Sequence, residues 1–311
     1  MSQPRHIVPR DTYLITRRVV CRTFLLRPDA IITQIVLYAL AVSAPRFGMQ
    51  VHAFCAMSNH LHLIVTDPLG VLPNFLHFFN RLVALCTKVF RAWEGSLWDS
   101  NAASVVRLTT RAAVVEKIAY VLANPVAAGL VPRADEWPGA KVSVGELGRG
   151  MLHAKRPKVY LDPENPTWPE EATLPLTLPP IIEQDDATRF RDDVADELLR
   201  LEGEVHAEMW QKGRSFLGVK QIMAVSPHDR ATSVEPPRGL NPTFAAGRDQ
   251  VDLRLRAAAA VRAFRAEYRE ALEHWREGVR CDCVRSVVFP AGTWWMRVFH
   301  GAAAHDATPA A

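Results

Sequence analysis

Apolar residues in the first 70 positions alternate between strand and helix spacing. Frequent β-branched residues predict a strand from Tyr13 to Val20. The run "RPDAIITQIVLYALAVSA" has apolar residues at helical spacing behind a Pro-Asp start, which predicts a helix. The runs "MQVHAFCAM" and "HLHLIV" predict two strands joined by a short hairpin turn at Ser58-Asn59.

The same alternation continues to about residue 125. A long amphipathic helix is expected from about Leu72 to Trp93, and "SVVRLTT" predicts a further strand. A helix should run from Arg111 to Ala123 and end at Asn124-Pro125, because proline opposes continuation. The order predicts an α+β fold, a small sandwich with helices on one face of a mostly antiparallel sheet.

The pattern changes after residue 148. Residues 151–180 contain seven prolines, so we expect 149–182 to be a Pro-rich linker or an extended crossover. Helical spacing returns near Ala187 to Trp210 and near Gln250 to Gly278. The chain thus divides into a first domain at 1–148, the linker or crossover, and a mostly helical region at 183–311 whose role the sequence does not indicate.

Composition excludes several classes of protein. Apolar stretches are interrupted by Arg, Pro or Asp before the roughly 20 residues that a membrane helix needs, so no membrane association is expected. The opening "MSQPRHIVPRD" has no apolar segment typical of a secretory signal. The five cysteines include no CxxC pair, which argues against a disulfide framework and favours a reducing cytoplasm.

Positive charge is concentrated in the first half of the chain. Residues 1–150 hold 16 Lys and Arg against 9 Asp and Glu, whereas residues 151–311 hold 21 against 24. Six arginines in the first 29 residues form a cluster suited to phosphate backbones. A solvated basic face is the simpler interpretation when charge is the only evidence.

Two histidines interrupt an otherwise apolar strand in "AMSNHLHLIV". Because side chains alternate along a strand, His60 and His62 point to one face while the intervening leucine points to the other. Neutral imidazoles at this spacing can form half of a site for a divalent cation. The alternative is that both rings are simply hydrogen-bonded in the core.

The helix "RAAVVEKIAYVLANP" carries a second pair of polar side chains. At about 100° per residue, Tyr120 and Asn124 lie one turn apart and off the apolar stripe. The alternative is a tyrosine half-buried at the helix edge, with Asn124 as a helix-end cap.

Together, the two pairs indicate phosphoryl transfer. A phenol is a poor nucleophile at neutral pH, but a nearby divalent metal can polarise a phosphodiester and stabilise charge on the transferring group. Tyrosyl attack would leave a phosphotyrosine-linked DNA end and a free hydroxyl. The linkage conserves the energy of the phosphodiester, so rejoining needs no ATP.

The stretches "MSNHLHLIV" and "YVLANPVAAGLV", separated by a long helix, resemble those of REP-associated tyrosine transposases. These enzymes are a branch of the HUH single-strand transposases, which have a ferredoxin- or RRM-like domain. The resemblance covers about the first 140 residues. It implies that His60, His62 and Asn124 bind Mg²⁺ or Mn²⁺, that Tyr120 is the nucleophile, and that the substrate is single-stranded DNA with a nearby hairpin.

Three basic residues are candidate DNA contacts: Arg17, Arg18 and Lys117. The chain departs from the resemblance at "LWDSNAASVVRLTT", where Arg107 is the only basic residue. Relatives act as monomers or as homodimers, and the sequence leaves both possibilities open.

Three functions remain open on sequence alone. The first is metal-dependent cleavage and strand transfer of single-stranded DNA through a covalent 5′-phosphotyrosine. The second is a non-catalytic, domesticated DNA-binding regulator with the same fold. The third is a metal phosphoesterase that uses activated water, for which Tyr120 would be dispensable.

Overall fold

The computed structural model describes residues 5–233, 242–247, 250–280 and 287–293. Within these ranges five strands form one mixed sheet in the order β2-β3-β1-β4-β7. The first four strands pair antiparallel, and β7 joins the β4 edge in parallel. This confirms the predicted α+β class. The strands are β1 (Asp11–Arg18), β2 (Gln50–Met57), β3 (His60–Asp67), β4 (Ser104–Leu108) and β7 (Phe244–Ala245).

The interior strand β3, between β2 and β1, carries both histidines of the sequence motif. Met57 pairs with His60 across the β2–β3 turn, which confirms the hairpin at Ser58-Asn59. On the other side of β3, Thr16 pairs with His62 and Arg18 with His60. Because cross-strand partners face the same side of a sheet, Thr16 and Arg18 share the face of the histidines.

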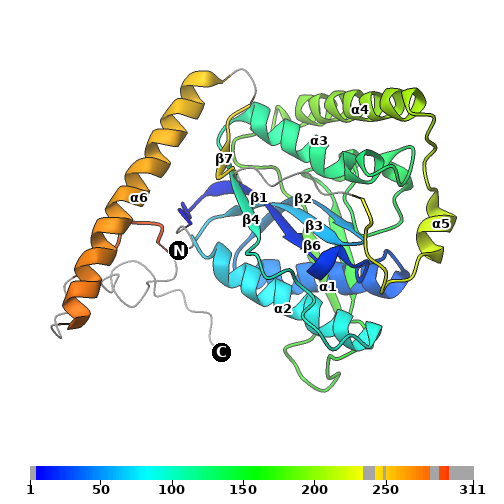
Figure 1. Cartoon of the computed structure of the whole chain (residues 1–311), viewed down its shortest axis with the longest axis horizontal. Coiled ribbons are helices and arrows are strands. Elements are labelled where there is room, and N and C mark those ends of the chain that lie inside the picture. Colours follow the sequence, from blue (N-terminus) through cyan, green and yellow to red (C-terminus); the bar gives the residue numbers. More distant parts are fainter. Residues whose placement is uncertain (1–4, 234–241, 248–249, 281–286, 294–311) are drawn as a thin grey trace.

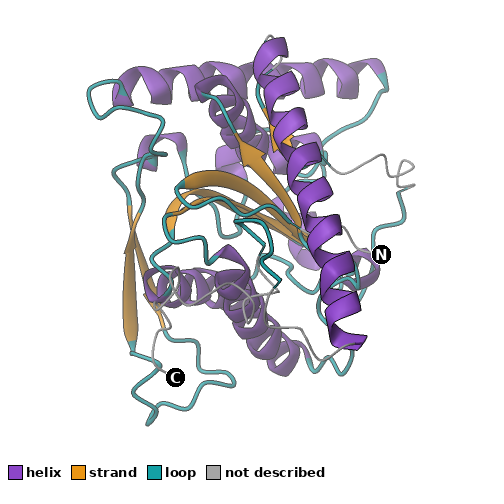
Figure 2. Cartoon of the chain, turned by 90° about the vertical axis from the view of Figure 1, so that its left-hand side faces the viewer, coloured by secondary structure: helices purple, strands orange, loops and turns teal. Residues whose placement is uncertain are grey.

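Helices cover both faces of the sheet, as Figures 1 and 2 show, so the expectation of helices on one face is wrong. Helices α1 and α2 pack together below the sheet in Figure 1, and α3 and α4 pack together above it. The sequence pattern reports that a helix has an apolar side, but it does not say which face of the sheet that side covers. The helices are α1 (Ala30–Arg46), α2 (Leu72–Arg91), α3 (Arg111–Ala127) and α4 (Ala187–Gln211).

Helix α3 continues past the expected stop at Asn124-Pro125 and ends at Ala127. Pro125 cannot donate an intrahelical hydrogen bond. Because it lies in the last turn of α3, the helix loses little by this and continues for two more residues. The following turn is closed by backbone bonds from Ala128 to Asn124 and from Leu130 to Pro125, both of 3.0 Å. Asn124 is therefore an internal helical residue that faces the sheet.

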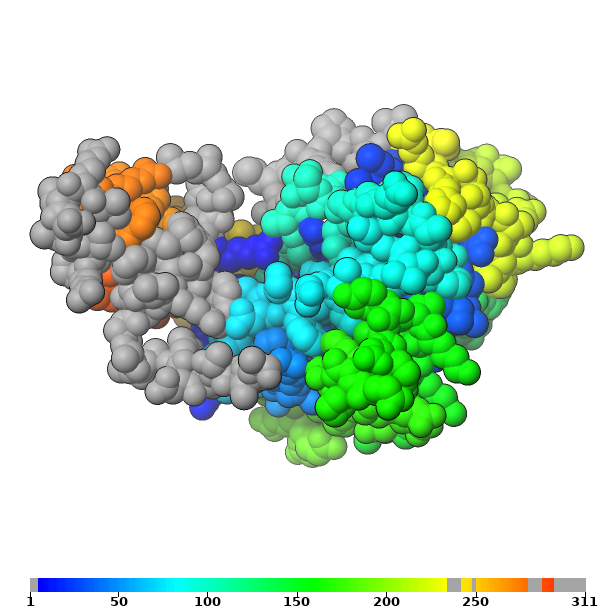
Figure 3. Space-filling model, turned by 90° about the horizontal axis from the view of Figure 1, so that it is seen from below, coloured from blue at the N-terminus to red at the C-terminus, as the bar shows by residue number. Residues whose placement is uncertain are grey.

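The Pro-rich segment contains a hairpin that its sequence pattern does not predict. Strands β5 (Met151–Lys155) and β6 (Glu171–Pro175) pair antiparallel and pack against α1. Figure 3 shows this segment in green against the blue and cyan residues of the first half. Prolines sit at the strand ends and in the connection between the strands, where no sheet hydrogen bond is needed from them.

The chain after residue 183 packs on the first half with part of its length. Helix α4 lies along α3, and Phe190 and Val194 of α4 belong to the same buried core as the sheet. A short helix, α5 (Val219–Ala224), follows, and the long helix α6 (Val251–Arg280) lies at the opposite end of the molecule (Figure 1). Residues from 294 onward, the end of the predicted 183–311 region, lie outside the described residues. The division into three regions stays a prediction.

None of the helices within the described ranges combines the length and apolarity needed to cross a lipid bilayer. Cys21, Cys55 and Cys86 are free thiols, and the two remaining cysteines, Cys281 and Cys283, lie outside the described ranges.

A largely buried hydrogen-bond network connects the sheet to the segment after β6. His52 Nδ1 donates to the Thr177 carbonyl at 2.8 Å, so its Nε2 accepts from the Thr66 hydroxyl at 2.8 Å. The Thr66 oxygen in turn lies 2.7 Å from the Thr12 hydroxyl. Burial lowers the pKa of His52 to about 4 and so favours the neutral ring.

Metal-free protein should therefore lose stability as the pH falls from about 6.5 to about 4. Over this window the unfolded chain binds a proton at His52 that the folded chain excludes, so the free energy of unfolding falls by up to about 1.4 kcal/mol per pH unit for each such group. Burial lowers the pKa of His60 to about 4 as well, and it acts in the same direction. Urea titrations across this window should show a shallower pH dependence in His52→Gln than in the wild type. If the free energy of unfolding depended on pH equally in both proteins, the lowered pKa of His52 would be contradicted.

Candidate metal and nucleophile site

The two histidines of β3 lie side by side beneath helix α3. Their ring centroids are 4.8 Å apart with the planes nearly perpendicular. His62 is buried, and its Nδ1 lies 2.9 Å from the Thr16 hydroxyl on β1. That hydroxyl can accept the Nδ1 proton, which leaves the lone pair on Nε2. The Nε2 atom of His62 is buried and makes no hydrogen bond.

The protonation of His60 follows from its neighbour Asn59. The Asn59 amide donates to the Arg22 carbonyl at 3.4 Å, so the Asn59 oxygen is the atom that faces His60 Nδ1 at 2.7 Å. An amide oxygen only accepts, so Nδ1 must carry the proton of the neutral ring. The lone pair of His60 then lies on Nε2.

Helix α3 supplies the next group. Its first turn is capped by Thr110, whose hydroxyl accepts from the Ala113 amide at 3.1 Å. Four turns later, the side-chain Nδ2 of Asn124 donates to the backbone carbonyl of Tyr120 at 3.0 Å. This bond fixes the orientation of the Asn124 side-chain amide. The Asn124 oxygen consequently faces His60 Nε2 at a distance of 3.3 Å.

The result is a group of polar atoms whose hydrogen bonds are incomplete. His60 Nε2 and Asn124 Oδ1 present lone pairs to each other, and the buried Nε2 of His62 has no partner. An unpaired buried polar atom costs about 1–3 kcal/mol, and a bound cation would offset this cost. Two imidazole nitrogens and an amide oxygen are a donor set that fits a divalent metal.

Within the described residues, no group of three or more His, Cys, Asp or Glu side chains could hold a metal ion. The candidate site therefore depends on the amide oxygen of Asn124 as its third ligand. Three protein ligands leave coordination positions open for a substrate oxygen.

The electrostatics of the site favour neutral imidazoles. Burial lowers the pKa of His60 to about 4. The Asn124 oxygen opposes this shift because it could accept a hydrogen bond from the protonated ring, whereas Arg18 and Arg22 lower the pKa further. Burial also places the pKa of His62 well below its usual range, and the neighbouring His60 adds to the shift. Neutral rings have the lone pairs that metal binding requires.

Tyr120 lies at the open side of this group. Its ring meets the His62 ring edge to face, with centroids 5.5 Å apart, and 44% of the residue is exposed. Lys117 Nζ lies 5.7 Å from the centroid of the Tyr120 ring, one turn earlier on α3. The phenol thus combines contact with a histidine and access for a large substrate.

The two adjacent arginines of β1 point to opposite faces of the sheet. Arg18 pairs with His60 and shares its face, whereas Arg17 pairs with Leu61 on the other face. The Arg17 guanidinium donates to the Asn101 carbonyl and lies 5.6 Å from the centroid of the Trp98 ring. The structure therefore brings Arg18 and Lys117 to the site but not Arg17.

Two further groups that shape the site were missed from sequence. Asn59 fixes the tautomer of His60, although its sequence signal was that of a turn residue. Thr16 supports His62 from β1, and the pairing of β1 with β3 could not be read from either strand alone. Asn59 could have been found from its position directly before the histidine motif.

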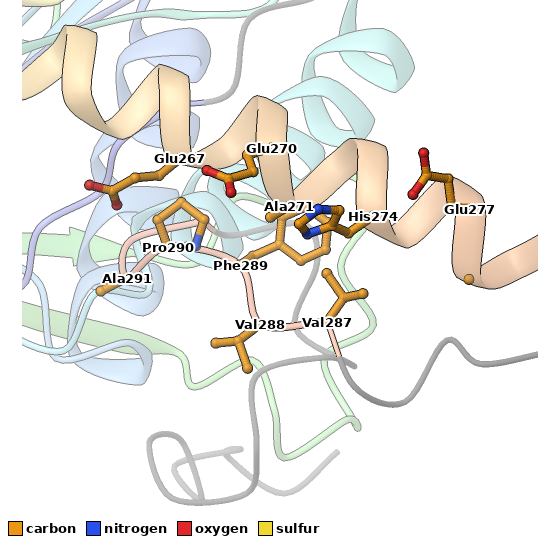
Figure 4. A pocket seen from close by; sticks show the side chains of 11 residues that line it. Glu267, Glu270, Ala271, His274, Glu277, Val287, Val288, Phe289, Pro290 and Ala291 are labelled. Atoms are coloured by element: carbon orange, nitrogen blue, oxygen red, sulfur yellow. The ribbon is translucent and has the colours of Figure 1, made fainter.

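A cavity of about 810 Å³ lies away from this site, between α6 and residues 287–291 (Figure 4). Glu267, Glu270 and Glu277 project along this side of α6, together with His274 (Figure 4). Three carboxylates repel a polyanion, so this cavity is poorly suited to a nucleic-acid backbone.

No protein-family model and no curated protein matches the chain. Among solved structures, a REP-associated tyrosine transposase bound to a REP hairpin is similar at 16% identity and a TM-score of 0.40, covering 47% of this chain and 84% of that one. A candidate transposase from Deinococcus radiodurans R1 is similar at 20% identity and a TM-score of 0.27, covering 34% and 85%. Neither likeness is high enough to assign the chain to a family.

Proposed function

We propose that the protein cleaves and transfers single-stranded DNA through a covalent phosphotyrosine at Tyr120, with Mg²⁺ or Mn²⁺ held by His60, His62 and Asn124. The observation that carries the proposal is that two acceptor atoms, His60 Nε2 and Asn124 Oδ1, face each other near the unpartnered, buried Nε2 of His62, beside an exposed phenol. A core histidine pair with only a structural role would find donors for its ring nitrogens.

The proposed reaction is an exchange of phosphodiester bonds. The Tyr120 oxygen bonds to phosphorus, the bond from phosphorus to the 3′ oxygen breaks, and that oxygen leaves as a hydroxyl with a proton. The phenol loses its own proton to water, and the 5′ phosphate stays on Tyr120. Attack by a second 3′ hydroxyl reverses these steps and joins a new strand.

Each side chain has a separate task in this scheme. Thr16 and Asn59 hold the histidine rings so that Nε2 of each is available to the metal, which supplies charge stabilisation at the phosphate when bound. Lys117 and Arg18 add positive charge near the phenol and the histidines, where the phosphate would bind. Asn124 connects the histidines to the tyrosine, because its side-chain oxygen faces His60 and its side-chain Nδ2 donates to the Tyr120 backbone carbonyl.

The direct test uses a pool of hairpin-containing single strands with randomised flanks, labelled at the 3′ end, incubated with the protein and Mn²⁺. The proposal predicts a labelled protein band on a denaturing gel, because the 3′ fragment stays attached through its 5′ phosphate. Cleavage without an adduct would support a phosphoesterase that uses water. Binding without cleavage would support the non-catalytic regulator.

Arg18→Ala should weaken binding of single-stranded DNA severalfold and lower the slope of log affinity against log salt by about 0.7, the value for one phosphate contact. Arg17→Ala is the matched control, because the Arg17 side chain points to the other face of the sheet. Anisotropy titrations at several salt concentrations measure both effects. Equal losses in the two variants would argue against the histidine face as the DNA-binding face.

A further inference from the structure

A segment of the second half of the chain crosses one end of the candidate site. At its start, Leu217 and Gly218 donate backbone hydrogen bonds of 3.0 and 2.8 Å to Gly129 and Leu130, which follow α3. At its far end, the Phe24 amide donates to the Asp229 carbonyl at 2.8 Å. Residues 217–233 are thus tied both to the helix that carries Tyr120 and to the chain after β1. Figure 3 shows the yellow residues of this segment against the blue and cyan residues of the first half.

Between these attachments lies a cavity of about 430 Å³, which we call the side pocket. Its volume is in the range of small-molecule pockets. It is lined on the side of the first half by His60 and the preceding turn, and it is also lined by residues of the crossing segment. Its lining is mainly apolar, with Ala128, Leu217, Ile222 and Val225 among the apolar residues and Ser58 and Ser233 among the polar ones.

The backbone is strained where the pocket meets the strand carrying Arg18. Cys21 and Arg22, in a 3₁₀ turn (Val20–Arg22), have φ values of 51° and 57°, which non-glycine residues rarely adopt. Arg22 is held there from several sides. Its carbonyl accepts from Asn59 and from the Ala231 amide, and its guanidinium donates to the Ser233 carbonyl and hydroxyl at 2.6 and 2.7 Å. Strain maintained in this way is typical of binding sites.

We propose that the side pocket receives one unstacked nucleobase of the DNA strand, within a nucleotide or two of the phosphate that is cut. The inference rests on the proposed function for its substrate and adds to it a point of sequence selection. Apolar walls suit the faces of a base, and the hydroxyls of Ser58 and Ser233 can hydrogen-bond to its edge. His60 belongs both to the pocket and to the candidate metal site, so a base here would lie next to the reacting phosphate.

This assignment also gives residues 217–233 a role. Leu217, Ile222 and Val225 complete a wall that residues 1–148 alone would leave open. Arg27 steadies that wall, since its guanidinium donates to the carbonyls of Met223 and Val225 at 3.0 and 2.9 Å.

The test is an abasic scan of a strand recovered from the randomised pool by binding. Single abasic sites are placed at each position, and affinity is measured by anisotropy in Mn²⁺. We expect one position at which base removal weakens binding about five- to a hundredfold, the scale of one stacked base. In Ala128→Trp the indole should fill the pocket. We expect this variant to bind the intact strand more weakly by a similar factor, and removal of the base at the sensitive position should cause no further loss of affinity.

The matched control is Ala207→Trp, at an exposed alanine on α4 outside the pocket, which should retain the wild-type scan. A scan without any sensitive position, or a penalty that persists in Ala128→Trp, would overturn the inference. The adduct assay separates this failure from failure of the proposed function. If the adduct forms but no abasic position weakens binding, only the base-pocket inference is contradicted. If one abasic position weakens binding in the wild type but not in Ala128→Trp, and no adduct forms, only the proposed chemistry is contradicted.

Discussion

Replacing Tyr120 by phenylalanine will abolish the covalent protein–DNA adduct and slow strand cleavage by at least about a thousandfold, the scale expected for loss of a nucleophile. The hydroxyl is the only group removed, and the ring keeps its edge-to-face contact with His62. DNA affinity should stay near that of the wild type, because basic residues rather than the phenol supply it. Denaturing gels and anisotropy titrations measure the two quantities separately.

The matched control is Tyr160→Phe, which removes the hydroxyl of another exposed tyrosine and should leave adduct formation unchanged. An adduct that survives in Tyr120→Phe would assign the linkage to another residue. Unimpaired cleavage in the same variant would favour attack by water.

His62→Leu will eliminate stabilisation of the protein by Mn²⁺ while changing metal-free stability by less than about 1 kcal/mol. At a hundred times its dissociation constant, a bound ion raises the free energy of unfolding by about 2.7 kcal/mol, and this gain should vanish in the variant. Metal-free stability should be nearly conserved because two effects oppose each other. The variant loses the bond to Thr16 but also removes a buried nitrogen that has no partner.

His52→Leu is the informative control, because His52 is equally buried but has partners on both nitrogens. This substitution should destabilise the metal-free protein by about 1–3 kcal/mol and leave the Mn²⁺ effect intact. Thermal or urea unfolding with and without Mn²⁺ gives both numbers. If His62→Leu destabilised the metal-free protein as much as His52→Leu, the structural interpretation of His62 would be favoured.

Much of the candidate site was predictable because it depends on local periodicity. Alternation along β3 placed His60 and His62 on one face, and helical spacing placed Tyr120 beside Asn124. These rules act over a few residues and need no knowledge of the partner elements. The same local reasoning ended the helix at Asn124, since it weighed the proline without the turn that follows.

The remaining features depend on contacts between distant segments. Arg17 and Arg18 were equivalent in sequence, and only the pairing of β1 with β3 assigns them to opposite faces. The hairpin of β5 and β6 is stabilised against α1, so its prolines alone indicated a linker. Residues 217–233 form little regular structure of their own, and their place is determined by bonds to Gly129 and Phe24.

The contacts that hold α3 against the rest of the chain bear on whether the proposed cleavage needs one chain or two. Arg111, at the start of α3, is paired with Asp186 and Asp193 on the outer side at 3.0 and 2.5 Å, and α4 packs along its length. Tyr120 thus contacts His62 of the same chain, and under the proposed function one chain supplies both the nucleophile and the metal ligands. We therefore expect that a Tyr120 variant and a His60 variant, mixed in one reaction, will not restore the adduct that each fails to form alone.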